Sequence, residues 1–485
     1  MNMQELTIGK YTLESLTNGM YASPLDLYRE YIQNAVDSID DAKESSLSAP
    51  EKYYIDISID PDTRSITIFD NGKGIPKKKA VKTLVDVGNS KKNRNRSRGF
   101  RGIGRLAGLG YCERLVFTTS YLEENVASVV SFDAKKLEEL LLSDSSEVES
   151  VNDVLGQVIE TRQVSEKSKR HYFKVELIGV TNSDKLLDLE VVENYLIQHA
   201  PLRYAKEFKW QRTITEKIKA LGYVIPSYDI RLNKIPLYKP YEDAFVSDRV
   251  KRNEDSIKDV EVVPFYRNEK LSAVLWCAKT NYFGTILNNS IKGIRIRQGN
   301  ILIGDKMSCS SFFKEERFNG WLIGEIHVID EGLIANARRD DFEKNEAYYV
   351  FVENVKEWSG VQTHEIRKLS YERSLSTEKK AVIEAEDFSD VNDLLDESID
   401  LDEGYGESDL LDQAESENVA EVDYIGKLSA LINQKKFQTK YRALNINLKL
   451  TMDQRKVLER VFDLIVSEYD KRQAERFINI ISSNF

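Results

Sequence analysis

The pattern of residues 25–39 constrains the fold of this chain more than any other stretch. Its apolar residues recur at helical spacing, which predicts a helix with one buried face; they are Leu25, Leu27, Tyr31, Ile32, Ala35, Val36 and Ile39. Glu30 and Asn34 are four residues apart and therefore share one side of that helix, with Asp37 close by. A carboxamide oxygen suits Mg²⁺, and a carboxylate can orient or deprotonate a water. Taken alone, the stretch favours the simpler interpretation of an amphipathic helix with a solvated polar face.

Length and composition bound the class of protein. A chain of 485 residues predicts about three domains. It has no apolar run near the roughly 20 residues of a membrane helix, and its first residues do not begin a signal peptide, so we expect a cytoplasmic protein without a membrane partner. Cys112, Cys277 and Cys309 lack metal-ligand spacing and are expected to be reduced thiols. The four histidines form no sequence cluster, so we expect no zinc site.

The net charge of −11 is unevenly distributed. Residues 384–423 contain 17 Asp and Glu and no Lys or Arg, which leaves the rest of the chain near +6. Such a run cannot form a core, so we expect a disordered linker that acts as a solvated tether or binds a partner. The mildly basic remainder permits nucleic-acid binding without demonstrating it.

A second polar motif follows a predicted pair of strands. Residues 53–60 alternate as a half-buried strand should, residues 62–64 turn the chain, and residues 65–69 return as a second strand. Asp70 stands at the end of that strand, and Gly72 and Gly74, followed by Ile75, allow the backbone to approach a ligand closely. The alternative is an ordinary polar turn, because Asn-Gly is common in turns.

A third motif is rich in glycine. Gly99, Gly102, Ile103 and Gly104 enter a helical, apolar pattern, and such glycines can direct backbone N–H groups and a helix N-terminus at phosphate. The segment lacks the Gly-Lys-Ser/Thr of a Walker A loop, and no βαβ unit frames it as a dinucleotide site.

In this order, the three stretches resemble the motifs of the GHKL ATPase superfamily: gyrase B, HtpG-type heat-shock chaperones, histidine kinases and MutL. The matching residues are Glu30, Asn34, Ala35 and Asp37 for E-x-x-x-N-A-x-D; Asp70, Gly72, Gly74 and Ile75 for D-x-G-x-G-I; and Gly99, Gly102 and Gly104 for G-x-x-G-x-G. Ser90 and Lys92, within residues 88–92, also resemble the G-x-S-x-K that precedes the lid in MORC-type members. The resemblance implies an α+β fold that begins with a Bergerat α/β sandwich, a mixed sheet with helices on one face.

The same resemblance implies a role for each matching residue, with ATP and Mg²⁺ as cofactors. Glu30 would activate the hydrolytic water and Asn34 would bind Mg²⁺. Asp70 would accept a hydrogen bond from the adenine amino group, Gly72 and Gly74 would shape the adenine pocket, and the glycines from Gly99 to Gly104 would belong to a lid over the triphosphate. Asp37 is as well explained by a structural ion pair or cap. Lys77, Lys78 and Lys79 are better explained by a solvated charged run than by attraction of phosphate.

One departure from the family pattern concerns adenine. Many members place Gly-Thr at the start of the strand that corresponds to residues 174–177, and that Thr supports adenine through water. Here the preceding residues, 169–173, contain no Thr. The resemblance therefore leaves this contact unassigned.

A fourth motif lies far along the chain. Strands at 292–305 and 321–330 are followed by Asn336, Arg338, Arg339, Asp340 and Asp341. This order resembles the transducer domain of HtpG-type chaperones, in which an Arg reaches the γ-phosphate. Arg339 is the matching position and Arg338 the nearby alternative, whereas a charged turn before the helix from Glu343 is the simpler interpretation. The transducer-like part and the lack of a His before Glu30 argue against a histidine kinase.

These observations predict four regions: a GHKL ATP-binding domain (1–187), a transducer-like α/β middle domain (188–370), the acidic linker (371–423) and a small helical C-terminal region (424–485). We expect a Mg²⁺-dependent ATPase that forms an ATP-dependent homodimer and acts as a clamp or chaperone-like switch on a protein client. The alternatives are a MutL- or MORC-like clamp on DNA in bacterial defence or DNA maintenance, and a nucleotide-gated scaffold with little turnover.

Overall fold

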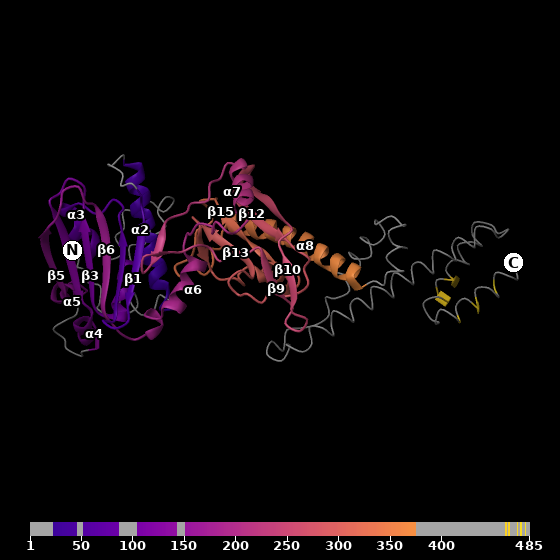
Figure 1. Ribbon diagram of the computed structural model, residues 1–485, viewed down its shortest axis with the longest axis horizontal. Coiled ribbons are helices and arrows are strands. Elements are labelled where there is room, and N and C mark those ends of the chain that lie inside the picture. Colours follow the sequence, from indigo (N-terminus) through magenta and orange to yellow (C-terminus); the bar gives the residue numbers. More distant parts are fainter. Residues whose placement is uncertain are drawn as a thin grey trace, which may run out of the picture. The chain divides into compact units, whose positions relative to one another are not determined.

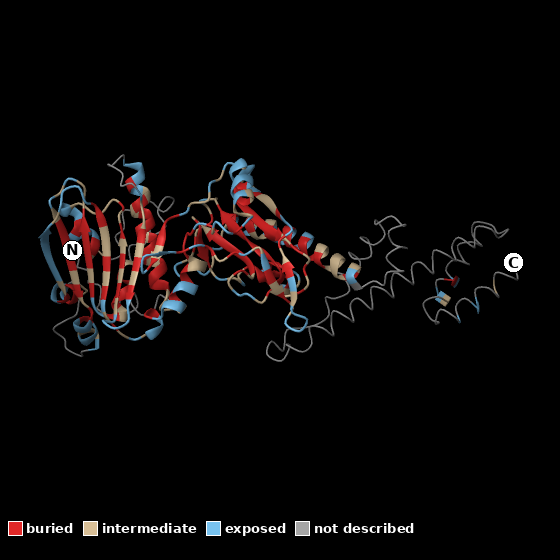
Figure 2. Ribbon diagram, viewed as in Figure 1, coloured by how far each residue is buried: buried red, intermediate tan, exposed pale blue. Residues whose placement is uncertain are grey.

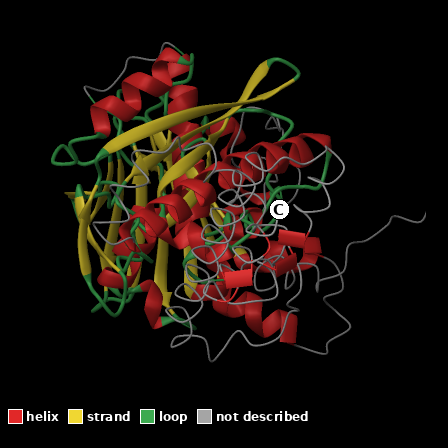
Figure 3. Ribbon diagram, turned by 90° about the vertical axis from the view of Figure 1, so that its right-hand side faces the viewer, coloured by secondary structure: helices red, strands yellow, loops and turns green. Residues whose placement is uncertain are grey.

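The computed structural model describes residues 23–45, 52–86, 104–142 and 151–374, with residues 461, 462, 464, 465, 473, 476, 477 and 481. Strands and helices occur together in its folded regions (Figure 3), so the predicted α+β class is confirmed. The chain divides into two units, residues 1–363 and 364–485. The described residues near the C-terminus are helical, whereas the acidic linker from residue 375 onward lies outside the described residues.

An eight-stranded sheet forms the first part of the chain (Figure 1), in the order β5-β4-β3-β6-β2-β1-β7-β8. Its strands are β1 (Ile55–Asp60), β2 (Ser65–Asp70), β3 (Cys112–Ser120), β4 (Val126–Asp133), β5 (Ile159–Ser165), β6 (Tyr172–Val180), β7 (Ile230–Leu232) and β8 (Ile235–Pro236). All neighbours are antiparallel except β1 and β7, which pair in parallel. The predicted turn between β1 and β2 is present, and Arg64 takes a left-handed φ of 48° there.

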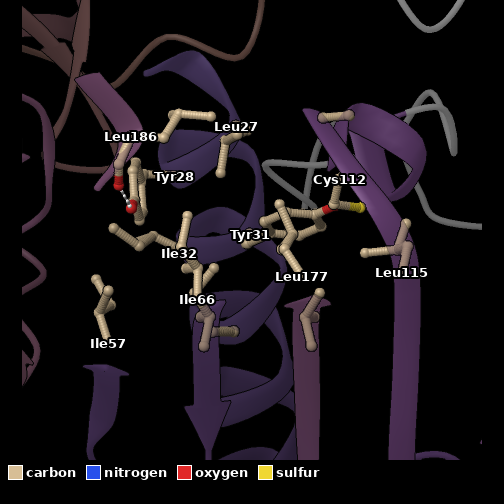
Figure 4. Packing of buried hydrophobic residues seen from close by; sticks show 14 of the residues in the cluster. Leu27, Tyr28, Tyr31, Ile32, Ile57, Ile66, Cys112, Leu115, Leu177 and Leu186 are labelled. Carbon is tan, nitrogen blue, oxygen red and sulfur yellow. Dashed lines mark hydrogen bonds between the residues drawn. The ribbon is translucent and has the colours of Figure 1, made fainter. Parts of the chain in front are cut away.

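Helix α2 (Asp26–Glu44) covers one face of this sheet. Figure 4 shows Tyr28, Tyr31 and Ile32 of α2 pointing toward apolar side chains of the strands, among them Ile57 and Leu177. The remaining helices of this part are α3 (Lys77–Val85), η1 (Gly104–Tyr111), α4 (Ala134–Leu142), α5 (Val151–Val158), η2 (Asp184–Leu186) and α6 (Leu189–His199), whereas α7 (Gln211–Ala220) packs against a second sheet. Side chains from α2, η1, α4, α5 and α6 share one buried apolar cluster with the strands, so the core lies between the sheet and its helices.

The two edges of this sheet differ. Strand β5 is exposed along almost its whole length (Figure 2). At the other edge, β7 and β8 extend the sheet past residue 188, and Asn233 fixes them by donating its backbone N–H to Ile57 O and accepting from Ile59 N through Oδ1. The boundary at 187/188 stays a prediction, although the sheet itself continues beyond it.

The residues at both ends of helix α6 set its length. It begins at Leu189, because Asp188 caps it by accepting hydrogen bonds from the backbone N–H groups of Glu190 and Val191. It ends at His199, because the residue before a proline is biased away from helical geometry and Pro201 follows Ala200.

A second, five-stranded sheet has the order β11-β12-β15-β13-β14. Its strands are β11 (Asp259–Arg267), β12 (Lys270–Lys279), β13 (Gly293–Gln298), β14 (Ile301–Ile303) and β15 (Ile323–Val328). Around it lie β9 (Ala244–Ser247), β10 (Asn253–Ser256), η3 (Ser310–Phe312), η4 (Glu316–Trp321) and the long α8 (Glu346–Ser374). Gly299 and Asn300 both take positive φ and form the tight turn between β13 and β14. No helix among the described residues is long and apolar enough to span a bilayer.

Candidate functional site

Helix α2 presents a partly accessible polar stripe within a mostly buried element. Glu30, Asn34 and Ser38 are spaced four residues apart, and each is only partly buried between fully buried neighbours. Eight residues of α-helix rise about 12 Å, so the stripe has roughly that length. Glu30 and Asn34 are predicted site residues, whereas Ser38 was not identified from the sequence.

At one end of the stripe, Glu30 lies against glycine. A Cβ at Gly104, the first residue of η1, would stand 2.2 Å from Glu30 Oε2, so a larger residue there would displace the carboxylate from this position. Tyr31 holds η1 on the helix, because its hydroxyl donates to Arg105 O (3.1 Å) and accepts from Gly108 N (2.9 Å). Glu30 and Gly104, which the sequence motifs place 74 residues apart, are therefore brought together.

The loop that follows β15 reaches the same end of the stripe. Arg339 Nε is 3.7 Å from Glu30 Oε1, and the Arg339 side chain is 13% exposed. Its left-handed backbone (φ 58°) and the hydrogen bond from Gly304 N to its carbonyl (2.9 Å) fix the loop conformation. The neighbouring Arg338 is exposed, so Arg339, rather than the alternative Arg338, is the guanidinium brought to Glu30.

Arg29 connects the helix and this loop. Its guanidinium lies 3.3 Å from Asp26 Oδ1 and 3.7 Å from Glu30 Oε1, and donates to Arg338 O at 3.1 Å. Tyr195 of α6 donates its hydroxyl to Asp26 (2.9 Å), and burial raises the pKa of Tyr195 well above its ordinary value, so the phenol stays protonated. Nothing in the sequence motifs singles out Arg29 or Tyr195; the only signal was the position of Arg29 next to Glu30.

At the other end of the stripe lies the loop of residues 71–76, which joins β2 to α3. Asp70 is buried, and its Oδ1 accepts a hydrogen bond from Gly72 N (2.9 Å). A Cβ at Gly72 would meet Ser38 Oγ at 2.4 Å, and Lys73 N donates to Ser38 O (3.0 Å). Gly74 has a φ of 67°, and a Cβ there would meet Ser120 O at 1.9 Å. The packing of the loop against α2 and β3 thus requires both glycines.

Other predicted residues have different positions. Asp37 is buried on α2, and Ile75 packs partly against the core of the sheet. Lys77, Lys78 and Lys79 are exposed on α3, which agrees with a solvated charged run. Ser90, Lys92, Gly99, Gly102 and Ile103 lie outside the described residues.

The oxygen donors of the stripe suit a phosphate-bound Mg²⁺ better than an all-protein metal site. Among the described residues, no three His, Cys, Asp or Glu side chains gather as a metal cage. The partly accessible amide of Asn34 is the donor between the two ends of the stripe. Mg²⁺ usually takes one or two protein oxygens and completes its shell with phosphates and waters.

Residues 27–161 match the family model described as histidine kinase-, DNA gyrase B-, and HSP90-like ATPase. This part of the chain belongs to the GHKL ATPase superfamily. The matched region contains the polar stripe, the Asp70 loop and Gly104. The Arg339 loop lies outside it. The residues at Glu30, Asn34 and Asp70 therefore fall within the GHKL domain.

Curated relatives give a consistent picture over a limited length. The chain is 28% identical over 146 residues to the chaperone protein HtpG of Buchnera aphidicola subsp. Baizongia pistaciae, an alignment that covers 26% of this chain and 23% of the relative. HtpG of Anaplasma marginale is 26% identical over 196 residues, which is 36% of this chain and 30% of the relative. HtpG of Serratia proteamaculans is 33% identical over 87 residues, 17% of this chain and 14% of the relative. The chain therefore spans less than a third of each of these relatives.

Proposed function

We propose that this protein is a Mg²⁺-dependent ATPase that acts as an ATP-gated homodimeric clamp with a chaperone-like role in the cytoplasm. The observation that carries the proposal is the polar stripe of α2, which runs for about 12 Å between the Asp70 loop and the Glu30–Gly104–Arg339 cluster. The GHKL domain and the similarity to HtpG chaperones support ATP as the ligand and a protein client.

In this proposal, each residue acts on a different part of the nucleotide. The buried Asp70 accepts a hydrogen bond from the adenine amino group, with Gly72, Gly74 and Ile75 shaping that pocket. Asn34 supplies an oxygen for Mg²⁺, and Ser90, Lys92, Gly99, Gly102, Ile103 and Gly104 belong to the phosphate side. Bound Mg²⁺ neutralises charge on the phosphates. Asp37, which is buried on α2, belongs to the same nucleotide site and supports the helix there.

The reaction is hydrolysis of the γ-phosphate. Glu30 takes a proton from a water whose oxygen attacks the γ-phosphorus, the bond from that phosphorus to the β–γ bridging oxygen breaks, and ADP leaves with the electron pair. Arg339 stabilises negative charge on the transferring phosphoryl group, as an arginine does in many phosphoryl-transfer sites. Its 3.7 Å distance from Glu30 supports this role, because a water held by that carboxylate would lie near the guanidinium.

The remaining expectations belong to the same proposal. The GHKL domain comprises residues 1–187, the transducer-like middle domain 188–370, the acidic linker 371–423 and the helical region 424–485. ATP binding pairs two GHKL domains, and hydrolysis reopens the clamp. The acidic linker is a tether that is available to a partner.

The decisive experiment measures ATP affinity and Mg²⁺-dependent turnover of the full chain. Glu30→Gln should bind ATP normally but lose about a hundredfold or more in turnover, because a general base typically contributes that factor. Asp70→Asn should abolish binding, and Arg339→Met should lose turnover at unchanged affinity. Glu44→Gln, at the exposed end of the same helix, is the matched control and should behave as wild type.

Three outcomes would change the proposal. A wild-type chain that binds no ATP overturns it, and binding without turnover replaces it with a nucleotide-gated scaffold. Loss of turnover in Arg338→Met but not in Arg339→Met transfers the role to Arg338.

Separate experiments test the assembly and the client. Velocity sedimentation with ATP and ADP tests the dimer, and protection of an aggregating protein tests the chaperone role. Salt-sensitive retention on DNA instead would indicate a DNA clamp.

A further inference from the structure

The loop of residues 71–76 follows β2, but the hydrogen bonds that fix it come from β3 and from the residue before β6. It leaves β2 at Asp70 and crosses the end of β6 to reach the end of β3, since Phe173 of β6 pairs with both Asp70 and Thr119. In antiparallel pairs, directly opposite residues lie on the same face. Asp70 and Thr119 therefore share the face of the sheet that α2 covers.

Thr119 holds the far end of the loop with both functions of its hydroxyl. Thr119 Oγ1 accepts a hydrogen bond from Ile75 N at 2.8 Å and donates to Tyr172 O at 3.0 Å. The side chain is buried, with the residue 1% exposed. Water therefore cannot easily replace either bond, and removal of the hydroxyl would leave the Ile75 amide without its partner.

His171 holds the middle of the loop. Its Nδ1 lies 2.5 Å from Gly72 O, and because a carbonyl only accepts, Nδ1 carries the proton and donates. The residue is buried, and Ser120 Oγ anchors the preceding residue by donating to Arg170 O at 3.0 Å. Gly72 in turn donates its N–H to Asp70 Oδ1 (2.9 Å). A continuous set of hydrogen bonds therefore runs from His171 through Gly72 to the Asp70 carboxylate.

We propose that Thr119 and His171 form a clasp that positions Asp70 and the 71–76 loop and thereby sets the affinity for the nucleoside. This inference rests on the proposed function, in which the loop binds the adenine part of ATP. Neither residue touches the nucleotide in this account; both act through Gly72, Ile75 and Asp70. The clasp contributes to binding and not to the chemical step, which takes place at the Glu30 end of the stripe.

The test separates affinity from turnover in the full chain. Thr119→Val keeps the β-branched shape but removes the hydroxyl, and His171→Phe keeps the ring but removes the donor. Each should weaken ATP affinity about tenfold, the effect of one lost buried hydrogen bond, while turnover at saturating ATP stays within about twofold. Thr119→Ser and His171→Asn retain a hydroxyl and a side-chain N–H donor, respectively, and should recover most of the affinity.

Thr118→Val is the matched control, because Thr118 is the preceding residue of β3 and its side chain points to the other face of the sheet. Amide hydrogen exchange at Lys73 and Ile75, measured without nucleotide, gives a second readout that does not depend on ATP. Exchange at Ile75 should be at least about tenfold faster in Thr119→Val than in wild type or Thr118→Val.

The outcomes are distinguishable from a failure of the proposed function. If wild type binds ATP and Thr119→Val and His171→Phe bind it equally well, the clasp does not position the site and only this inference fails. Faster exchange at Ile75 with unchanged affinity also overturns it, since the loop is then held but not used for binding. If wild type binds no ATP, both the function and the positioning role fail, even where exchange confirms the hydrogen bonds.

Discussion

Glu325 is a carboxylate without access to solvent at the centre of the five-stranded sheet. Its donors come from several elements: Lys239 Nζ (2.6 Å), Tyr204 OH (2.9 Å), Tyr241 OH (3.0 Å), His327 Nε2 (3.1 Å), Trp276 Nε1 (3.2 Å) and Arg297 Nε. Burial would raise the pKa of Glu325, but the charges of Arg297 and Lys239 outweigh burial and hold that pKa well below its ordinary value. The carboxylate therefore stays ionised and joins residues 204–241 to β13 and β15.

Glu325→Gln should destabilise the fold strongly, because it leaves Lys239 and Arg297 as buried charges without a counter-ion. Breaking one side of a buried ion pair costs about 3–5 kcal/mol in the free energy of unfolding. Glu261→Gln is the control, since Glu261 pairs with Lys279 at 3.1 Å where both side chains are partly exposed, and it should cost less than about 1 kcal/mol. Urea denaturation measures both. Equal effects would show that the Glu325 cluster adds no special stability.

His327 predicts a pH dependence of stability. Burial lowers the pKa of His327 to about 4, although the hydrogen bond to Glu325 acts in the opposite direction. The unfolded chain has a histidine pKa near 6.5, so between about pH 6.5 and 4 the unfolded state binds a proton that the folded state does not. Stability therefore falls as pH falls through this window. His327→Gln should lower the slope of the unfolding free energy against pH by one proton, about 1.4 kcal/mol per pH unit, when that free energy is measured by urea denaturation at a series of pH values. An unchanged slope would contradict the assignment.

Helix α2 shows how far local sequence determines an element and its site. The apolar spacing of Leu27, Tyr31 and Ile32 predicted a buried face, and those residues are buried. The spacing of Glu30 and Asn34 predicted a shared side, which the structure also has. Ser38 was missed because a serine carries no motif signal, and its importance comes from the loop that packs on it.

Pairings over long sequence distances were less predictable. Strand β7 joins β1 in parallel across about 170 residues, and its three residues give no local signal of their partner. The clasp residues Thr119 and His171 were missed for the same reason, because their contacts with the 71–76 loop arise only when β3 and β6 lie side by side. The family pattern drew attention instead to a Thr that is missing near residue 173. In the structure, Phe173 pairs with Thr119.

Gly104, at the start of η1, leaves room for the Glu30 carboxylate in its observed position, and Gly104→Ala should displace that carboxylate. Its φ is not in the left-handed region, so the effect of Gly104→Ala comes from the added Cβ, which would stand 2.2 Å from Glu30 Oε2. The carboxylate must move, and turnover should fall about tenfold or more, since misplaced catalytic groups lose much of their effect. Gly156→Ala in α5, where a Cβ meets nothing within 4 Å, is the control and should keep full turnover. Equal turnover of the two variants would show that catalysis does not depend on the close approach of Gly104 to Glu30.

At the scale of the whole molecule, side-chain contacts join the GHKL domain to the Arg339 loop. Arg29 donates to Arg338 O, and Arg339 pairs with Glu30, so both arginines connect α2 to the same loop. Sequence motifs could propose Arg339 for the phosphate but not its contact with Glu30, because 309 residues separate the two. In the proposed function, catalysis at Glu30 therefore uses a loop that lies outside the matched family region.

A double-mutant cycle of Arg29→Met and Arg339→Met should show that the two arginines act as a unit. Methionine keeps an apolar side chain of some length and removes the charge. If Arg29 positions the loop that carries Arg339, loss of either arginine disables the same contact, and the double variant should turn over no more slowly than the slower single variant. Such coupling of neighbouring residues typically amounts to about 0.5–3 kcal/mol.

The pair Arg29→Met and Arg317→Met is the control cycle, because Arg317 pairs with its neighbour Glu315, lies over the Phe318 ring and is in η4 with a partly exposed side chain. The effects of Arg29→Met and Arg317→Met on turnover should add, since residues without shared partners are usually independent. Additive effects of Arg29 and Arg339 as well would mean that Arg29 serves only the stability of α2. The measurement therefore decides whether the Arg338–Arg339 loop reaches Glu30 through its own conformation or depends on α2 to hold it there.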